Sequence, residues 1–70
     1  MNQEAVQRLT LLCERIMISR TLATEAETDL ADLVLYQLRN FGQTAEIKPA
    51  VSIQLQTTVN RIKGQSYGNR

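Results

Sequence analysis

The sequence has no histidine and no tryptophan, and Cys13 is the one cysteine among its 70 residues. Without histidine, the side chain that most often serves as a general acid or base is missing. A single thiol cannot close a disulfide within the chain or supply the four ligands of a structural zinc site. No serine or cysteine lies in a nucleophile motif, and the three glycines form no phosphate-binding loop. We therefore expect a protein that is not an enzyme, with no catalytic residue, cofactor or metal.

Long apolar runs are also absent. The longest, residues 16–18 and 33–36, are far shorter than the roughly 20 residues that cross a bilayer. The first residues, "MNQEAVQRLTLLCER", lack the basic segment followed by an apolar block that is typical of a signal peptide. A single cysteine without an export signal indicates a reducing compartment, so we expect a cytoplasmic protein that makes no membrane contact.

The small size of the chain favours self-association. Seventy residues make one domain. A chain this short buries only about 60% of the surface that it exposes when unfolded, and its stability as a monomer is marginal. Disulfides, metals and oligomerisation are the usual supports of such domains. Since a disulfide within the chain is excluded and a structural zinc site is nearly excluded, a homodimer is expected.

Apolar residues at helical spacing predict a first helix over residues 3–20. A second, smaller apolar set, Leu11, Ile18 and Leu22, lies on the opposite side of this helix among charged residues. These side chains are either isolated exposed residues or a second contact surface. The main arc, which would face the core, contains Ala5, Val6, Leu9, Leu12, Cys13, Ile16 and Met17.

A second helix is predicted over residues 25–41. Thr24 and Glu27 have the spacing of a capping box, and Gly42 suits the turn that ends the helix. The carboxylates Glu25, Glu27 and Asp29 could form a site for a metal or a basic partner, but the simpler explanation is that they lie at the positive end of the helix dipole. Apolar residues cover more than half of the circumference, which is typical of a central helix contacted from two sides. Tyr36 points away from this arc.

The segment "VSIQLQTTV", residues 51–59, fits two periods. Alternation explains Val51, Ile53 and Leu55 as one face of a strand, whereas a helix explains Val51, Leu55, Val59 and Ile62 and leaves Ile53 outside the stripe. Pro49 suits a first helical turn, and Gly64 suits a helix end. We predict a helix over 49–63 and keep a strand that pairs with its copy in a dimer as the alternative. A disordered polar tail is expected over 64–70.

The predicted fold class is therefore all-α: a small bundle of two long helices and a shorter third, forming one domain over residues 1–63 and completed by homodimerisation. The dimer core is expected to include Leu9, Leu12, Ile16, Leu30, Val34 and Leu38.

The apolar surface exceeds what a three-helix monomer needs, and such an excess marks a protein interface. We expect a self-associating adaptor, or a regulator of a larger protein. The expected partner-binding residues are Leu11, Ile18, Leu22 and Tyr36.

The charge distribution supports an alternative function. Residues 1–38 carry a net charge of −3, and residues 39–70 carry +4. A basic half can bind nucleic acid, which makes a small dimeric nucleic-acid-binding regulator the second hypothesis. The signal is weak, because the connector 42–48 is longer than a helix-turn-helix uses and the third helix begins with poor base-reading residues. The residues concerned are Lys48, Arg61, Lys63 and Arg70.

Overall fold

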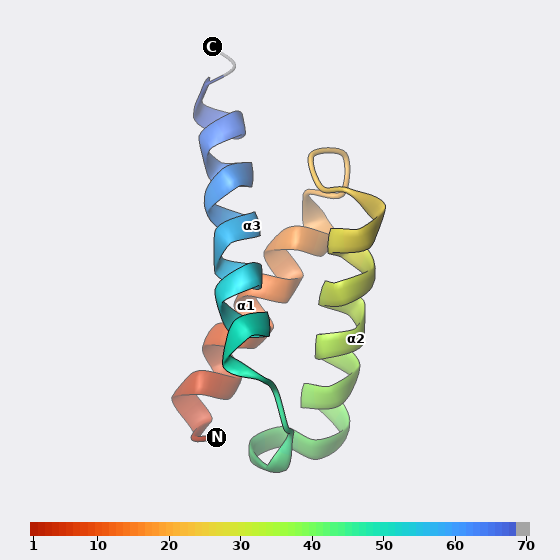
Figure 1. Ribbon diagram of the computed structural model, residues 1–70, viewed down its shortest axis with the longest axis vertical. Helices are drawn as coiled ribbons and strands as arrows, with labels where there is room; N and C mark the ends of the chain where they lie inside the picture. The colour runs from red at the N-terminus through yellow and green to blue at the C-terminus, as the bar shows by residue number, and fades with distance from the viewer. Residues whose placement is uncertain (69–70) are drawn as a thin grey trace.

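The computed structural model describes residues 1–68, and three α-helices make up most of them (Figure 1). α1 spans Gln3–Ile18, α2 spans Glu25–Phe41 and α3 spans Pro49–Gly68, with a short 3₁₀ turn, η1, at Gly42–Thr44. α1 and α3 run in the same direction, and α2 runs opposite to both (Figure 1). Residues 1–68 contain no strand, which confirms the all-α prediction.

Local side-chain chemistry explains where α1 begins and ends. The Asn2 side chain accepts a hydrogen bond from the Ala5 amide at 2.8 Å and caps the first turn. The helix ends at Ile18, two residues before the predicted end, because the amides of Leu22 and Ala23 both donate to the Ser19 carbonyl. That turn lies in a segment rich in serine and threonine, which compete with helical hydrogen bonding.

The capping box at the start of α2 is confirmed. The Glu27 amide donates to Thr24 Oγ1 at 3.1 Å, and the Thr24 amide donates to Glu27 Oε1 at 2.8 Å. The helix ends at Phe41, as predicted. Gly42 follows with φ +54° and ψ −126°, a conformation that side chains with a Cβ rarely adopt, so glycine is required at this turn.

α3 is a helix, and the strand alternative is wrong. Leu55 is 1% exposed and Ile53 is 67% exposed, although both would lie on the same face of a strand. Pro49 begins the helix, as predicted. The predicted end at residue 63 is wrong: the helix continues through 64–68, where a disordered tail was expected, and residues 69–70 lie outside the described residues.

The third helix is therefore the longest and not the shortest of the three. It has 20 residues, against 16 in α1 and 17 in α2. Gly64 does not end it, and Arg61 Nη1 donates to Gln65 Oε1 across one turn at 3.1 Å.

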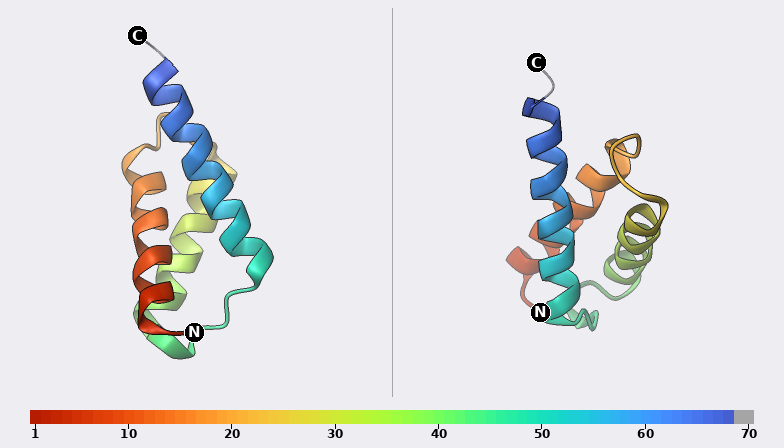
Figure 2. Two further views of the ribbon diagram at one scale, coloured as in Figure 1. Left: turned by 90° about the vertical axis from the view of Figure 1, so that its left-hand side faces the viewer. Right: turned by 45° about the horizontal axis from the view of Figure 1, so that its top comes forward.

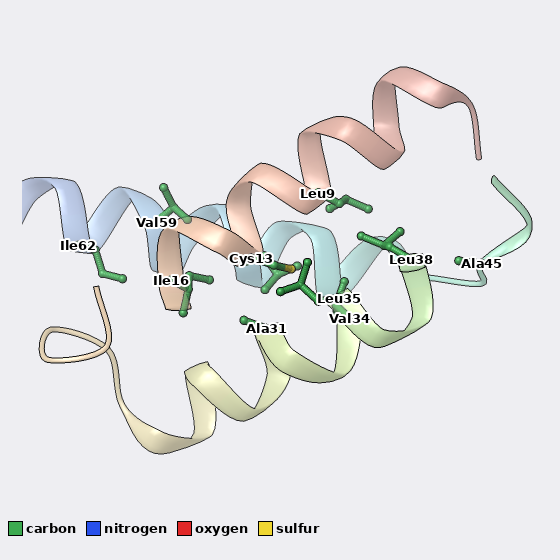
Figure 3. Packing of buried hydrophobic residues seen from close by; sticks show 11 residues of the cluster. Leu9, Cys13, Ile16, Ala31, Val34, Leu35, Leu38, Ala45, Val59 and Ile62 are labelled. Atoms are coloured by element: carbon green, nitrogen blue, oxygen red, sulfur yellow. The ribbon is translucent and has the colours of Figure 1, made fainter. Parts of the chain in front are cut away.

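The core forms within one chain, where apolar side chains of all three helices point toward one another (Figure 3). Of the six residues predicted for a dimer core, four are buried in this core and two, Leu12 and Leu30, are partly buried against it. The four buried residues are therefore used inside the monomer, and a dimer would have to be built mainly from other residues. The buried apolar residues are Leu9, Cys13, Ile16, Ala31, Val34, Leu35, Leu38, Ala45, Leu55, Val59 and Ile62.

Candidate functional site

Three of the four predicted partner-binding residues are exposed. Leu11, Ile18 and Tyr36 are 66%, 82% and 61% exposed. Leu11 and Ile18 are seven residues apart, so they lie on the same side of α1, about 10 Å apart along its axis. Leu22 differs from the other three: it is partly buried and packs against the core, because the turn after α1 folds back toward the bundle.

Leu11 and Ile18 line a groove between α1 and α3, with a volume of about 460 Å³. We call it the α1/α3 groove. α1 and α3 lie on one side of the bundle with α2 behind them (Figure 2, left), and no residue of α2 lines this groove. Its lining combines apolar and charged side chains: Arg8, Leu11, Leu12, Glu14, Arg15, Ile18, Gln56, Val59 and Lys63.

The charged side chains of the groove are mostly basic. Arg8, Arg15 and Lys63 are exposed, and none of them forms an ion pair among residues 1–65. Glu14 is the one carboxylate in the lining, which leaves a net charge of +2. The groove therefore offers apolar contact area together with three cations that are free to pair with an acidic partner.

Sequence reasoning missed Arg8 and Arg15 as site residues. Like Leu11 and Ile18, they are seven residues apart and lie on one side of α1. Their spacing indicates a shared helix face, which the charge balance between the two halves of the chain does not reveal. Lys63 was named as a nucleic-acid contact, and its place beside α1 depends on the packing of α3.

A second exposed surface runs along α2. Glu25, Asp29, Asp32 and Tyr36 recur every three or four residues, so they form one line along this helix, and all four are exposed. We call this line the α2 stripe. Asp32 lies at the edge that faces α1, where it lines a hollow together with Ile18 and Arg39. The helix dipole explains why carboxylates are favourable in the first turn of α2, but its effect falls off within that turn. Asp29 and Asp32 lie beyond the first turn, so the dipole does not explain them. Leu33, 58% exposed, lies beside the stripe.

The residues of the nucleic-acid hypothesis do not form one patch in the described part of the chain. Lys63 lies in the α1/α3 groove, and Lys48 lies before the start of α3, about 20 Å away along the helix. Arg61 pairs with Glu27 and is used inside the fold. Arg70 lies outside the described residues.

Glu27 connects α2 to α3. It forms an ion pair with Arg61, and its Oε2 accepts a hydrogen bond from Thr58 Oγ1 at 3.3 Å. Arg61 Nη1 also donates to the Leu22 carbonyl at 3.2 Å. The Thr24 amide, with further contributions from Arg61 and Thr58, lowers the pKa of Glu27 below its usual value. These contacts make Glu27 a structural residue.

The lowered pKa of Glu27 predicts acid-sensitive stability. Its interactions stabilise the fold above the unfolded-state pKa of about 4.3 and are lost as the pH falls through the lower folded-state pKa. Glu27→Gln keeps the side-chain shape but does not titrate. The free energy of unfolding, measured in urea at about pH 7 and about pH 3, is expected to fall less in this variant than in the wild type. Equal losses would show that Glu27 does not contribute to acid sensitivity.

Cys13 has no reactive character. The thiol is fully buried, and burial, assisted by the nearby Glu14 carboxylate, raises its pKa to about 11. The thiolate is the reactive form of cysteine, and at neutral pH almost none is present. Cys13 is therefore a core residue, as its position in the main arc of α1 predicted.

Neither a metal site nor a membrane segment is found in the described residues. Residues 1–68 contain no group of three or more acidic, cysteine or histidine side chains placed to hold an ion. None of the helices in this range has both the length and the apolar composition that crossing a bilayer requires.

Comparisons with protein-family models, curated proteins and solved structures find no match to this chain. The α1/α3 groove and the α2 stripe are therefore the features from which a function can be inferred.

Proposed function

We propose that this protein acts without catalysis, by binding protein surfaces through the α1/α3 groove, as a self-associating adaptor or as a regulator of a larger protein. The observation that carries the proposal is the exposure of Leu11 and Ile18 inside a groove with a charged rim. Apolar surface rimmed by polar groups is typical of protein interaction sites. Contacts of a helix in a groove supply binding energy mainly through such apolar anchors.

The apolar floor of the groove favours a protein over a nucleic acid as its partner. Phosphates would pair with Arg8, Arg15 and Lys63, but they would leave Leu11 and Ile18 without an apolar contact. A protein segment satisfies both kinds of side chain at once. Lys48, Arg61 and Lys63 give little support to nucleic-acid binding, because they do not lie together on one surface of the described part of the chain.

Self-association and a cytoplasmic location belong to the same proposal. A chain of 70 residues gains stability from association, and its core residues are used within the monomer, so the outward residues are the ones available. Cys13 is the single cysteine and is buried as a free thiol, which suits a reducing compartment.

The proposal predicts that Ile18→Glu abolishes partner binding and leaves the fold intact. Residue 18 is 82% exposed, so a glutamate there is solvated in the free protein, but it would be buried in any complex that fills the groove. The measurement is capture of bound proteins from the native host with the wild type and the variant as baits. Circular dichroism should show equal helix content in the two baits.

Ile53→Glu is the matched control. It makes the same chemical change at a residue of similar exposure that does not line the groove. Proteins retained by the wild type and by Ile53→Glu but lost from Ile18→Glu would support the proposal. Retention of the same proteins by all three baits would overturn it, because the groove would then not be the binding surface.

A further inference from the structure

We propose that the α1/α3 groove binds the α2 stripe of a second copy of this chain, so that copies associate head to tail. This inference rests on the proposed function, because it names the occupant of the same groove. It requires two surfaces on each molecule, one for each side of the contact. Both are present and exposed on the single chain.

The two surfaces have opposite charge. The groove carries a net +2, with its three cations free of ion pairs among residues 1–65. The stripe carries three carboxylates, at Glu25, Asp29 and Asp32, next to the exposed Arg39, which leaves this surface with a net charge of −2, and none of these side chains forms an ion pair among the same residues. Contact between them would pair charges that the isolated monomer leaves unpaired. Complementary charge of this kind steers association and disfavours contact between like surfaces.

The apolar side chains also match. Leu11 and Ile18 project into the groove, and Tyr36 and Leu33 project from α2 on and beside the stripe. All four are more than half exposed in the monomer. An aromatic anchor placed among aliphatic residues and surrounded by charged pairs is the usual anatomy of a protein interface.

The positions of the two surfaces determine the type of assembly. α2 lies behind α1 and α3 (Figure 2, left), and the groove has no lining residue from α2, so a chain cannot fill its own groove. Contact between unlike surfaces leaves one groove and one stripe free after each addition. Such contacts grow into open chains unless the rotation closes a ring. The expected association is weak, concentration-dependent and reduced by salt, because the surfaces are small and the pairs lie at the rim.

Mixing two variants tests this arrangement directly. Leu11→Glu disables the groove and keeps the stripe, because Leu11 lines the groove and no hollow that includes a residue of α2, whereas Ile18 also lines a hollow with Asp32. The double variant Asp29→Asn/Asp32→Asn disables the stripe and keeps the groove. Masses are measured by light scattering on a size-exclusion column in low-salt buffer. Each variant alone is expected to associate at least about tenfold more weakly than the wild type. An equal mixture is expected to form 1:1 dimers that do not grow further, because only one intact groove and one intact stripe meet in each pair.

The other outcomes separate the two proposals. If the stripe variant associates as strongly as the wild type while Leu11→Glu does not, the groove binds something other than the stripe, and only the head-to-tail inference fails. If the wild type is monomeric at every concentration, self-association is overturned, and the capture experiment decides the proposed function independently. If Leu11→Glu associates like the wild type, the groove does not mediate self-association and the head-to-tail inference fails, and the capture experiment again decides the proposed function. Ile53→Glu serves as the control and should behave like the wild type.

Discussion

Val34→Asp is expected to destabilise this protein strongly. Val34 is 3% exposed and lies in the core between the helices (Figure 3). An aspartate at this position buries a carboxylate without a partner, at a cost of about 3–5 kcal/mol. A domain of 70 residues has a total stability of roughly 4–10 kcal/mol, so the loss removes much of it. Thermal and urea unfolding, followed by circular dichroism, measure the effect.

The neighbouring residue provides the control for this substitution. Leu33 is 58% exposed, and Leu33→Asp places the same carboxylate in water one position earlier on the same helix. It is expected to change the free energy of unfolding by about 0.5 kcal/mol or less. A Val34→Asp variant that melts like the wild type would show that the core is placed wrongly around α2.

Leu55→Ala is the second prediction with a large effect. Leu55 is 1% exposed, and its truncation removes apolar contacts and leaves a cavity, at a cost of about 2–5 kcal/mol. Ile53→Ala, two residues earlier and 67% exposed, is expected to cost about 0.5 kcal/mol or less. Urea denaturation of the two variants and the wild type gives the difference. Equal effects would contradict the helical packing of α3, because residues 53 and 55 share a face only in a strand.

Helix boundaries were predictable where local chemistry determines them. Thr24 and Glu27 form a capping box through contacts within four residues, and Gly42 ends the helix with a positive φ, although its ψ of −126° differs from that of the left-handed cap that a helix-ending glycine often adopts. Gly64 has no such conformation and continues the helix, so a glycine alone was an unreliable end signal. The end of α1 was missed because hydrogen bonds to the Ser19 carbonyl close a turn that apolar spacing does not reveal.

The identity of the core was predictable, but its assignment to a dimer was not. Helical spacing identified Leu9, Ile16, Val34 and Leu38, all of which are buried. Whether such residues face a second chain or another helix of the same chain depends on how far α3 covers α1 and α2. Because the sequence predicted a shorter third helix, this covering was underestimated.

The candidate site was predictable only in part. Leu11 and Ile18 could be identified from their position on one helix, because exposure on α1 follows from the phase of its apolar arc. The groove itself could not be identified, because Lys63 is far from Arg8 in the sequence and they come together only through the packing of α3 on α1. Leu22 was misplaced because it lies in a turn, where helical phase does not apply.

The most direct test of the central claim is the mass of the protein in solution over a range of concentrations, measured by light scattering on a size-exclusion column for the wild type and Ile18→Glu. If the α1/α3 groove mediates self-association, the mass of the wild type rises above that of one chain as concentration increases, and the mass of the variant stays at one chain. Identical masses for the two proteins at every concentration would contradict a role of the groove in self-association.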